Sequence, residues 1–184
     1  SSAASDVYKR QLPNLATSYK WVDSKTLEFD LRKGVKFHNG EKFDADDVVF
    51  TMNYMGNPDN GAKPARNVNW WENAEKLGEY KVRLNLKKEF PAALEFLSGP
   101  LVIYPNDYYA KAGPEGMALK PVGTGPYAVT SVELGKRYKF KKYDGHHDGS
   151  PKGKANIGNI VIRTIDEINS QLYELFSLCI DWIL

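Results

Sequence analysis

The sequence predicts a mixed α/β fold, of the α+β kind, in one or two small domains. Several short segments alternate apolar and polar residues, as half-buried strands do, and others place apolar residues on one helical face behind a capping side chain. No segment repeats along the chain. With 184 residues, 42% of them hydrophobic and 26% charged, the chain is long enough to form a core.

The first predicted elements are two strands and a helix. Residues 26–32 alternate strictly between apolar and polar side chains, which predicts a half-buried strand. A second short strand is expected around Val35 and Phe37, before an Asn-Gly turn. Asp44 can then accept backbone N–H bonds at the start of a helix that ends near Gly56.

A long polar loop separates this helix from the next strand. The loop over residues 59–69 is interrupted by Gly and Pro and has a length that usually carries function or mobility. Residues 80–87 alternate again and predict another arm of a hairpin. The elements expected after it are a short helix over 91–97, an apolar strand-like run over 101–103 and a short helix over 105–111.

Residues 113–126 contain four glycines and three prolines, a composition that disfavours both helix and sheet. We therefore expect a domain boundary in this segment. The structural junction is assigned to Pro121, Gly123, Thr124, Gly125 and Pro126, in which the prolines restrict φ and the glycines allow conformations closed to other residues.

Three strands and a helix are expected beyond the junction. The strands cover residues 127–134, 138–143 and 159–165. Asp166 is expected to cap the helix that follows. The predicted buried face of this helix consists of Ile168, Leu172, Leu175 and Phe176.

The N-terminal residues 1–11 resemble the in-frame translation of a sequencing-library adapter, so we set them aside from the fold analysis as a non-native tail. The natural gene is then expected to continue upstream of Leu12, and any export signal would lie in that part. A genuine N-terminal segment is the alternative. No apolar run approaches the length needed to cross a bilayer, and Cys179, the one cysteine, can form neither an internal disulfide nor a thiolate metal cage.

The charge pattern argues against a nucleic-acid partner. The formal net charge is only +2. Five basic residues occur within 136–142, but Tyr138 and Phe140 alternate with them, as the inner face of a strand would. We therefore interpret this stretch as a solvated strand face.

The sequence offers no recognisable catalytic apparatus. It contains three histidines, none of them in a nucleophile motif, and no Gly-x-Ser-x-Gly elbow. The run Gly123-Thr124-Gly125-Pro126 lacks the Lys-Ser/Thr of a phosphate-binding loop, and Pro126 removes an amide donor. We expect no catalytic residue, no metal and no cofactor.

Two clusters leave alternatives open. His146 and His147 carry ligand-type atoms, but adjacent residues of an extended chain point to opposite sides, so a solvated turn is favoured over a surface metal site. His38, on a hairpin loop, is interpreted in the same way. Trp70 and Trp71 are either core residues or a platform on which a ligand stacks.

Three blocks of the sequence resemble family 5 of the extracellular solute-binding proteins, which are the dipeptide-, oligopeptide- and nickel-binding components of ABC importers. The first block covers residues 13–51, including the run from Thr26 to Glu41. Residues 121–127 form the second block, and a weaker third block covers residues 160–181.

The resemblance implies part of a periplasmic-binding-protein type II fold, in which two lobes close around a ligand about a hinge. Residues 12–120 would be the small α+β subdomain of lobe I, and residues 121–184 the start of its main sheet, truncated. The chain departs from the family pattern over 177–184. The ligand wall within this part is expected at Trp70, Trp71, Pro100, Leu101 and Tyr104.

The function implied by the resemblance is to bind a solute without changing it chemically. The protein would bind a peptide or similar small solute in the periplasm, or outside the cell on a lipid anchor, and deliver it to an ABC permease, most simply as a monomer. Nickel complexes, opines and oligosaccharides are alternative ligands. A sensor or chaperone module that captures peptides, and a peptide or amide hydrolase, are the alternative functions.

Overall fold

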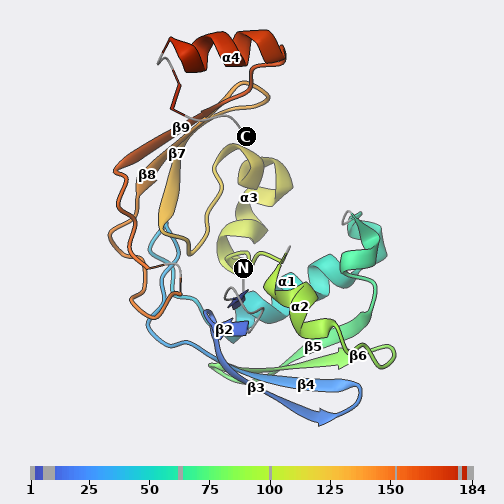
Figure 1. Ribbon diagram of the computed structural model, residues 1–184. Coiled ribbons are helices and arrows are strands. Elements are labelled where there is room, and N and C mark those ends of the chain that lie inside the picture. Colours follow the sequence, from blue (N-terminus) through green and yellow to red (C-terminus); the bar gives the residue numbers. More distant parts are fainter. Residues whose placement is uncertain are drawn as a thin grey trace.

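The computed structural model describes residues 3–5, 11–61, 64–99, 101–151, 153–177 and 180–181. Within these ranges the strands form a two-stranded, a four-stranded and a three-stranded sheet, and all of their pairings are antiparallel. The larger sheets lie at opposite ends of the molecule (Figure 1). The mixed α/β class predicted from the sequence is confirmed.

The four-stranded sheet has the strand order β3-β4-β6-β5. Its strands are β3 (Ala16–Asp23), β4 (Thr26–Leu31), β5 (Trp71–Gly78) and β6 (Lys81–Leu86). On β4 and β6, Leu27 lies opposite Leu84 and both are buried, as the alternation predicts. The inner face of this sheet therefore forms the core.

The sequence analysis missed β3 and β5. β3 pairs only with β4 among the described strands, and most of its side chains are exposed, so no apolar alternation marks it. β5 has register irregularities between Trp71 and Asn73 and between Lys76 and Gly78, and these break the two-residue period. Neither strand carries the pattern by which β4 was recognised.

Helix α1 (Ala45–Gly56) covers the core face of this sheet (Figure 1). Asp44 caps it as predicted, because its Oδ1 accepts a hydrogen bond from the amide of Asp46 at 2.9 Å. The Asp47 carboxylate accepts in turn from the amide of Asp44 at 2.9 Å, which completes a capping box. Two short 3-10 turns, η1 (Pro58–Asn60) and η2 (Ala65–Asn67), follow in the loop.

Two more helices connect the sheets. The predicted helix over 91–97 is present as α2 (Ala93–Ser98). The expected strand over 101–103 is wrong, because these residues pair with no strand in the described chain. Helix α3 (Asn106–Leu119) is longer than predicted: Gly113 interrupts it at a φ of 64°, and Pro114 starts the second helical piece, where its missing N–H costs nothing.

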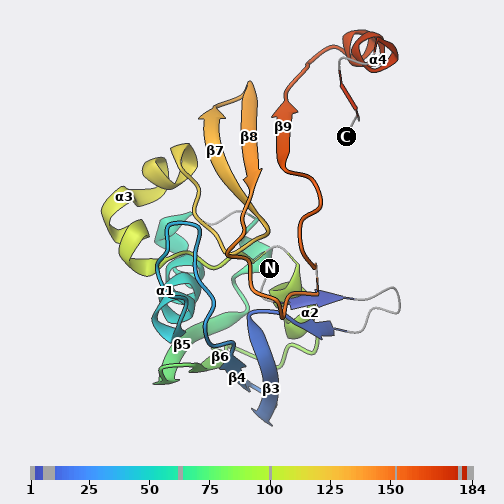
Figure 2. The same cartoon turned by 90° about the vertical axis from the view of Figure 1, so that its left-hand side faces the viewer.

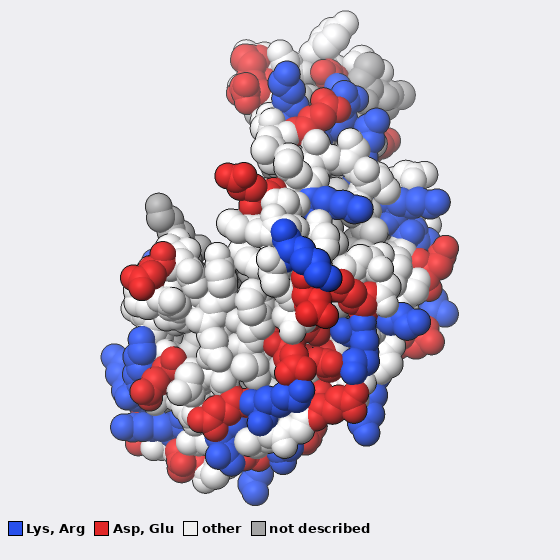
Figure 3. Space-filling model, turned by 180° about the vertical axis from the view of Figure 1, so that it is seen from behind, with Lys and Arg blue, Asp and Glu red and all other residues white. Residues whose placement is uncertain are grey.

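The three-stranded sheet has the order β7-β8-β9, from β7 (Tyr127–Glu133), β8 (Arg137–Lys142) and β9 (Asn159–Arg163), so the three strands predicted beyond the junction are confirmed. On β8, Lys139 and Lys141 are exposed while Tyr138 and Phe140 are half-buried, as expected of a solvated strand face. Figure 3 shows basic and acidic residues interspersed over one side of the molecule.

Helix α4 (Ile168–Phe176) differs from the prediction in two ways. Glu167, not Asp166, caps it, through a 2.8 Å bond from the Ser170 amide. The expected buried face is wrong, since no described residue of α4 is buried and Phe176 is 82% exposed. The helix projects beyond the end of the three-stranded sheet (Figure 2), and its Glu174 forms an ion pair with Arg163 of β9.

The N-terminal segment that the sequence analysis set aside contributes to a small hairpin. Strand β1 (Ala3–Ser5) pairs with β2 (Gln11–Pro13), and both strands include residues of that segment.

None of the described helices combines the length and the apolar character needed to span a membrane. Cys179 lies outside the described residues.

Candidate functional site

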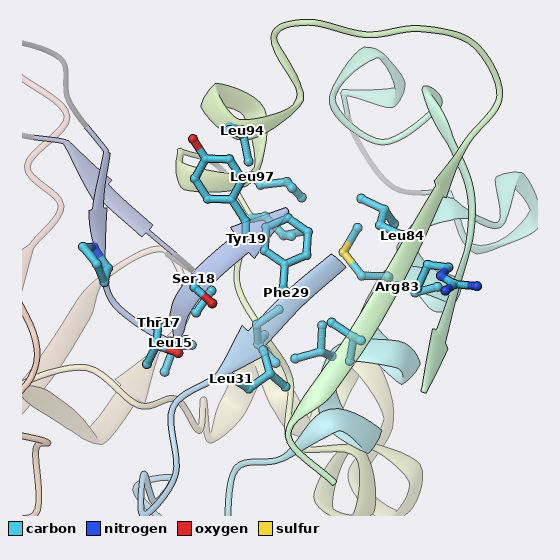
Figure 4. Close-up of a pocket in the computed structure, with 18 of the residues that line it drawn as sticks. Leu15, Thr17, Ser18, Tyr19, Phe29, Leu31, Arg83, Leu84, Leu94 and Leu97 are labelled. Atoms are coloured by element: carbon cyan, nitrogen blue, oxygen red, sulfur yellow. The ribbon is translucent and has the colours of Figure 1, made fainter. Parts of the chain in front are cut away.

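An apolar pocket of about 300 Å³ opens between the four-stranded sheet and helix α2 (Figure 4). Tyr19 and Phe29 project from β3 and β4 toward Leu94 and Leu97 of α2. The remaining lining residues are Leu12, Pro13, Leu15, Ala16, Thr17, Ser18, Leu31, Phe43, Val48, Met52, Ala74, Val82, Arg83, Leu84, Leu101 and Ile103.

This pocket has an apolar wall but few polar groups that could orient a ligand. Arg83 is the one charged residue in its lining, and its Nη2 already lies 2.7 Å from the Glu28 carboxylate. Ligand sites normally combine an apolar wall with a few polar groups that fix orientation. Thr17, Ser18 and Tyr19 are the other side chains in the lining that could serve. Thr17 and Ser18 already donate to the carbonyl and the carboxylate of Asp30 respectively, and Tyr19 contributes a phenol hydroxyl.

Trp70 and Trp71, predicted as a ligand platform or as core residues, both lie in the core. Their exposed fractions are 4% and 1%. The Trp71 indole donates to the Met52 carbonyl at 3.0 Å, and the Trp70 ring packs against Phe90 with centroids 4.8 Å apart. Protein atoms therefore cover both rings, and ligand contact by either residue stays a prediction.

The other residues of the expected ligand wall are placed as follows. Leu101 is buried and lines the apolar pocket. Tyr104 is half-buried against Tyr109, with ring centroids 4.9 Å apart, and burial raises the pKa of its phenol. Pro100 lies outside the described residues. The Tyr104 ring packs on Tyr109, whereas the Trp70 ring packs on Trp71, Phe90 and Phe96, and their shared role also stays a prediction.

His38 ties the loop after β4 to the junction. Its amide donates to the Gly123 carbonyl at 2.8 Å, and its ring nitrogens face the Gly123 amide and the Gly125 carbonyl. The carbonyl can only accept, so Nε2 carries the hydrogen and Nδ1 accepts. Burial lowers the pKa of His38, which favours this neutral form. The expectation of a solvated His38 is wrong, because both ring nitrogens are used.

These bonds correct the reason given for the junction glycines. Neither Gly123 nor Gly125 adopts a positive φ, and a Cβ at Gly125 would meet no atom within 4 Å. Positive φ is therefore not what the junction requires of them. The main-chain bonds with His38, together with a 3.1 Å bond from the Tyr143 hydroxyl to the Phe37 carbonyl, hold the junction against the first sheet's loop.

A second, more polar pocket of about 220 Å³ lies at the junction. His146 and His147 line it, and their ring centroids are 4.8 Å apart. The expected turn is present at residues 143–150, but the expected placement of the rings in solvent on opposite sides is wrong, because the chain is not extended there and both rings line one pocket. The rest of the lining is Asn14, Leu15, Val102, Ile103, Gly123, Thr124, Gly125, Pro126 and Ser150.

The electrostatics of this pocket favour the neutral form of His147. Burial, followed by the neighbouring His146 and Arg32, lowers the pKa of His147 to about 4. His146 Nδ1 lies 3.0 Å from the Thr124 carbonyl. No group of three or more His, Cys, Asp or Glu residues in the described chain is arranged to hold a metal ion.

Comparison with known proteins places this geometry in a family. The model of the bacterial extracellular solute-binding proteins, family 5 Middle, matches residues 11–183, and the chain belongs to this family. It is 30% identical over 176 residues to a di/tripeptide-binding protein 1 of Pseudomonas aeruginosa, covering 82% of this chain and 32% of that protein. It is 32% identical over 169 residues to the dipeptide-binding protein of Escherichia coli, covering 77% and 31%.

Solved structures agree. NikZ from Campylobacter jejuni, in complex with Ni(L-His), superimposes with a TM-score of 0.84 at 26% identity, over 97% of this chain and 36% of that one. The oligopeptide-binding protein AppA from Bacillus subtilis, in complex with a nonapeptide, gives 0.85 at 24% identity over the same shares. These neighbours are type II periplasmic binding proteins. The chain spans about a third of the length of its relatives.

The junction histidines are the residues that sequence reasoning placed wrongly. Each was assigned to a solvated turn from its local neighbours, Gly or Asn. The partners of His38 and His146 are the main-chain groups of residues 123–125, which follow His38 by 85 or more positions and precede His146 by about 20. The repeated Gly and Pro of the junction were the available signal, since such a segment leaves main-chain groups for side chains to bind.

Proposed function

We propose that this chain is part of the substrate-binding component of an ABC importer, which captures a peptide or a similar small solute outside the cytoplasmic membrane and delivers it to the permease. The match of the family model over residues 11–183 carries the proposal. The relatives that are 30% identical or more are named for di- and tripeptides, which makes a peptide the first ligand to test.

In this proposal the protein binds and releases its solute without changing it. His38 is not available as a general base, since both of its ring nitrogens are taken by the junction. The work of such a protein is to enclose a ligand, while energy and the channel come from separate proteins. A monomer in the periplasm, or one anchored by a lipid, suffices for this role.

The two sheets suggest how this part of the protein is divided. Residues 12–120 would be the small subdomain of the first lobe, with α1 and α2 on the four-stranded sheet. Residues 121–184 would begin the lobe's main sheet. His38 and Tyr143 would then hold the subdomain against that lobe, through the bonds of 2.8–3.3 Å described above.

Ligand binding by the complete protein tests the proposal. Isothermal titration with di-, tri- and oligopeptides should give one bound peptide per chain, and mass spectrometry of the recovered peptide should show it uncleaved. Deleting the gene should abolish uptake of that peptide. Recovery of cleaved peptide would establish a hydrolase instead, and normal uptake with an adjacent histidine kinase gene would favour a sensor.

The predicted ligand wall has its own test. Titration of the tryptophan fluorescence of the complete protein, with Trp70→Phe and Trp71→Phe as variants, should remove a ligand-induced change if either indole is in contact. A change that survives both substitutions would place the binding surface elsewhere.

A further inference from the structure

The junction pocket contains an arrangement that the proposed function does not use. His146 and His147, from the turn between β8 and β9, line the same pocket of about 220 Å³ as residues 123–126. Their rings are tilted by 49° with centroids 4.8 Å apart. His146 Nε2 and His147 Nδ1 are both buried, and neither has a hydrogen-bond partner among the described residues.

The hydrogen bond of His146 defines which of its nitrogens is available. Nδ1 lies 3.0 Å from the Thr124 carbonyl oxygen, which can only accept, so Nδ1 carries the hydrogen. Nε2 is then left with a lone pair directed away from that bond. A backbone carbonyl that fixes one ring nitrogen while the other coordinates is the usual arrangement around metal-binding histidines.

An unpartnered buried nitrogen is unfavourable, and two of them in one pocket call for a ligand. Folded proteins pair more than nine-tenths of their buried polar groups, and each exception asks for an explanation such as an ion. A water molecule would need hydrogen-bond distances of about 2.7–3.2 Å from each nitrogen. A metal ion bonds to imidazole nitrogen at about 2.0–2.1 Å. It can therefore bind a nitrogen around which protein atoms leave too little room for a water molecule to approach.

We propose that His146 Nε2 and His147 Nδ1 bind a divalent transition-metal ion of the class that prefers imidazole, namely Zn²⁺, Ni²⁺ or Cu²⁺. Water or pocket oxygen atoms complete the coordination, because two imidazoles leave positions open. Asp144 and Asp148 flank the pair in sequence and favour a cation, while the Arg32 guanidinium near His147 opposes it. The site is therefore one of moderate affinity.

The position of the site gives it a consequence. The His146 ring already joins the turn of residues 143–150 to the junction through Thr124. An ion held by both rings would strengthen this link and stabilise the folded arrangement in which the pocket is formed. The gain in stability depends on the ratio of the ion concentration to its dissociation constant.

Titration of the full chain with Zn²⁺ alone tests the proposal. Isothermal calorimetry should give one ion per chain, and His146→Gln and His147→Gln should each weaken binding at least tenfold. Glu89→Gln is the control, because Glu89 is an exposed residue of the first region and does not line the junction pocket. It should leave the dissociation constant within about twofold of that of the parent.

Electron paramagnetic resonance of the Cu²⁺-loaded chain gives a readout that does not depend on stability. The nitrogen hyperfine pattern should report two imidazoles in the parent and one in each single variant. Absence of saturable Zn²⁺ binding would overturn the proposal and leave the pocket to water. Unchanged binding in both histidine variants, or an equal loss in Glu89→Gln, would overturn it as well.

Discussion

The four-stranded and three-stranded sheets are built from the same kind of strand but are buried to very different extents. Leu27, Val82 and Leu84 of the first sheet are each at most 3% exposed. Among the described residues after Pro126, only Ser150 is buried. An alternating sequence gives a strand two faces, but burial requires a second layer. Helix α1 supplies that layer for the first sheet (Figure 1).

The second sheet, its loops and helix α4 expose several large apolar side chains. Exposed large apolar residues in this region are Leu134, Ile157, Val161, Ile162, Ile168, Leu172, Tyr173 and Phe176. The chain spans about a third of its relatives. The difference in burial between the two sheets predicts how much substitutions lower the free energy of unfolding. The loss should be large in the first region, small in the second and intermediate at the junction.

Trp71→Ala gives the largest effect. The indole is 1% exposed and donates to the Met52 carbonyl, so truncation leaves a cavity and removes this hydrogen bond. We expect a loss of about 3–5 kcal/mol in the free energy of unfolding, measured by urea denaturation. Phe176→Ala is the matched control at 82% exposure, with an expected change within about 0.5 kcal/mol. Equal costs would abolish the contrast between the regions.

Asp47→Asn tests a buried carboxylate of the first region. Asp47 is 3% exposed and accepts from the amides of Asp44 and Asn106, both at 2.9 Å. Burial nevertheless raises its pKa to about 6. The folded chain therefore binds the proton more tightly than the unfolded chain does, so the contribution of Asp47 is full below about pH 4 and is lost as the pH rises through 6.

Urea denaturation from pH 4 to pH 7 measures this contribution. The stability of the parent relative to Asp47→Asn should fall over that range, by at most ~3 kcal/mol. Asp46→Asn is the control, since the Asp46 carboxylate is half-exposed beside Lys76. A pH profile of Asp47→Asn parallel to that of the parent would contradict the prediction.

The same contrast explains what could be predicted from the sequence. Strand β4 and the Asp44 cap depend on neighbours within a few residues, and both were found. The burial of α4 was predicted from its apolar face, which is present, but burial needs a packing partner that a periodic pattern does not encode. The junction histidines depend on main-chain groups 20 or more residues away, so local composition suggested only a turn.

His38→Ala tests the connection between the two regions. The substitution removes two ring contacts and leaves the Gly123 amide without its acceptor. We expect a loss of about 1–2 kcal/mol at pH 7, measured by urea denaturation. Because burial lowers the pKa of His38, the unfolded chain takes up the proton first, and the parent should lose this advantage as the pH falls below about 6.5.

The control for the junction is Lys36→Ala, at an exposed position of the same loop, with an expected change within about 0.5 kcal/mol. Hydrogen exchange of the Gly123 amide adds a local readout, since the loss of its acceptor should speed exchange there. Unchanged exchange in His38→Ala would mean that the junction is held by its main chain alone.

Val161→Lys should have the smallest effect on stability and a clear one on association. Val161 is 54% exposed on β9, which pairs with β8 alone among the described strands and so presents an open edge. Lysine on such an edge opposes pairing between chains. We expect a change in unfolding free energy within about 0.5 kcal/mol and a larger monomer fraction by sedimentation velocity. Asn69→Lys is the control, because it adds the same charge at an exposed turn of the first region. An equal gain in the monomer fraction in this variant would show that the added net charge, and not the blocked apolar edge, reduces association.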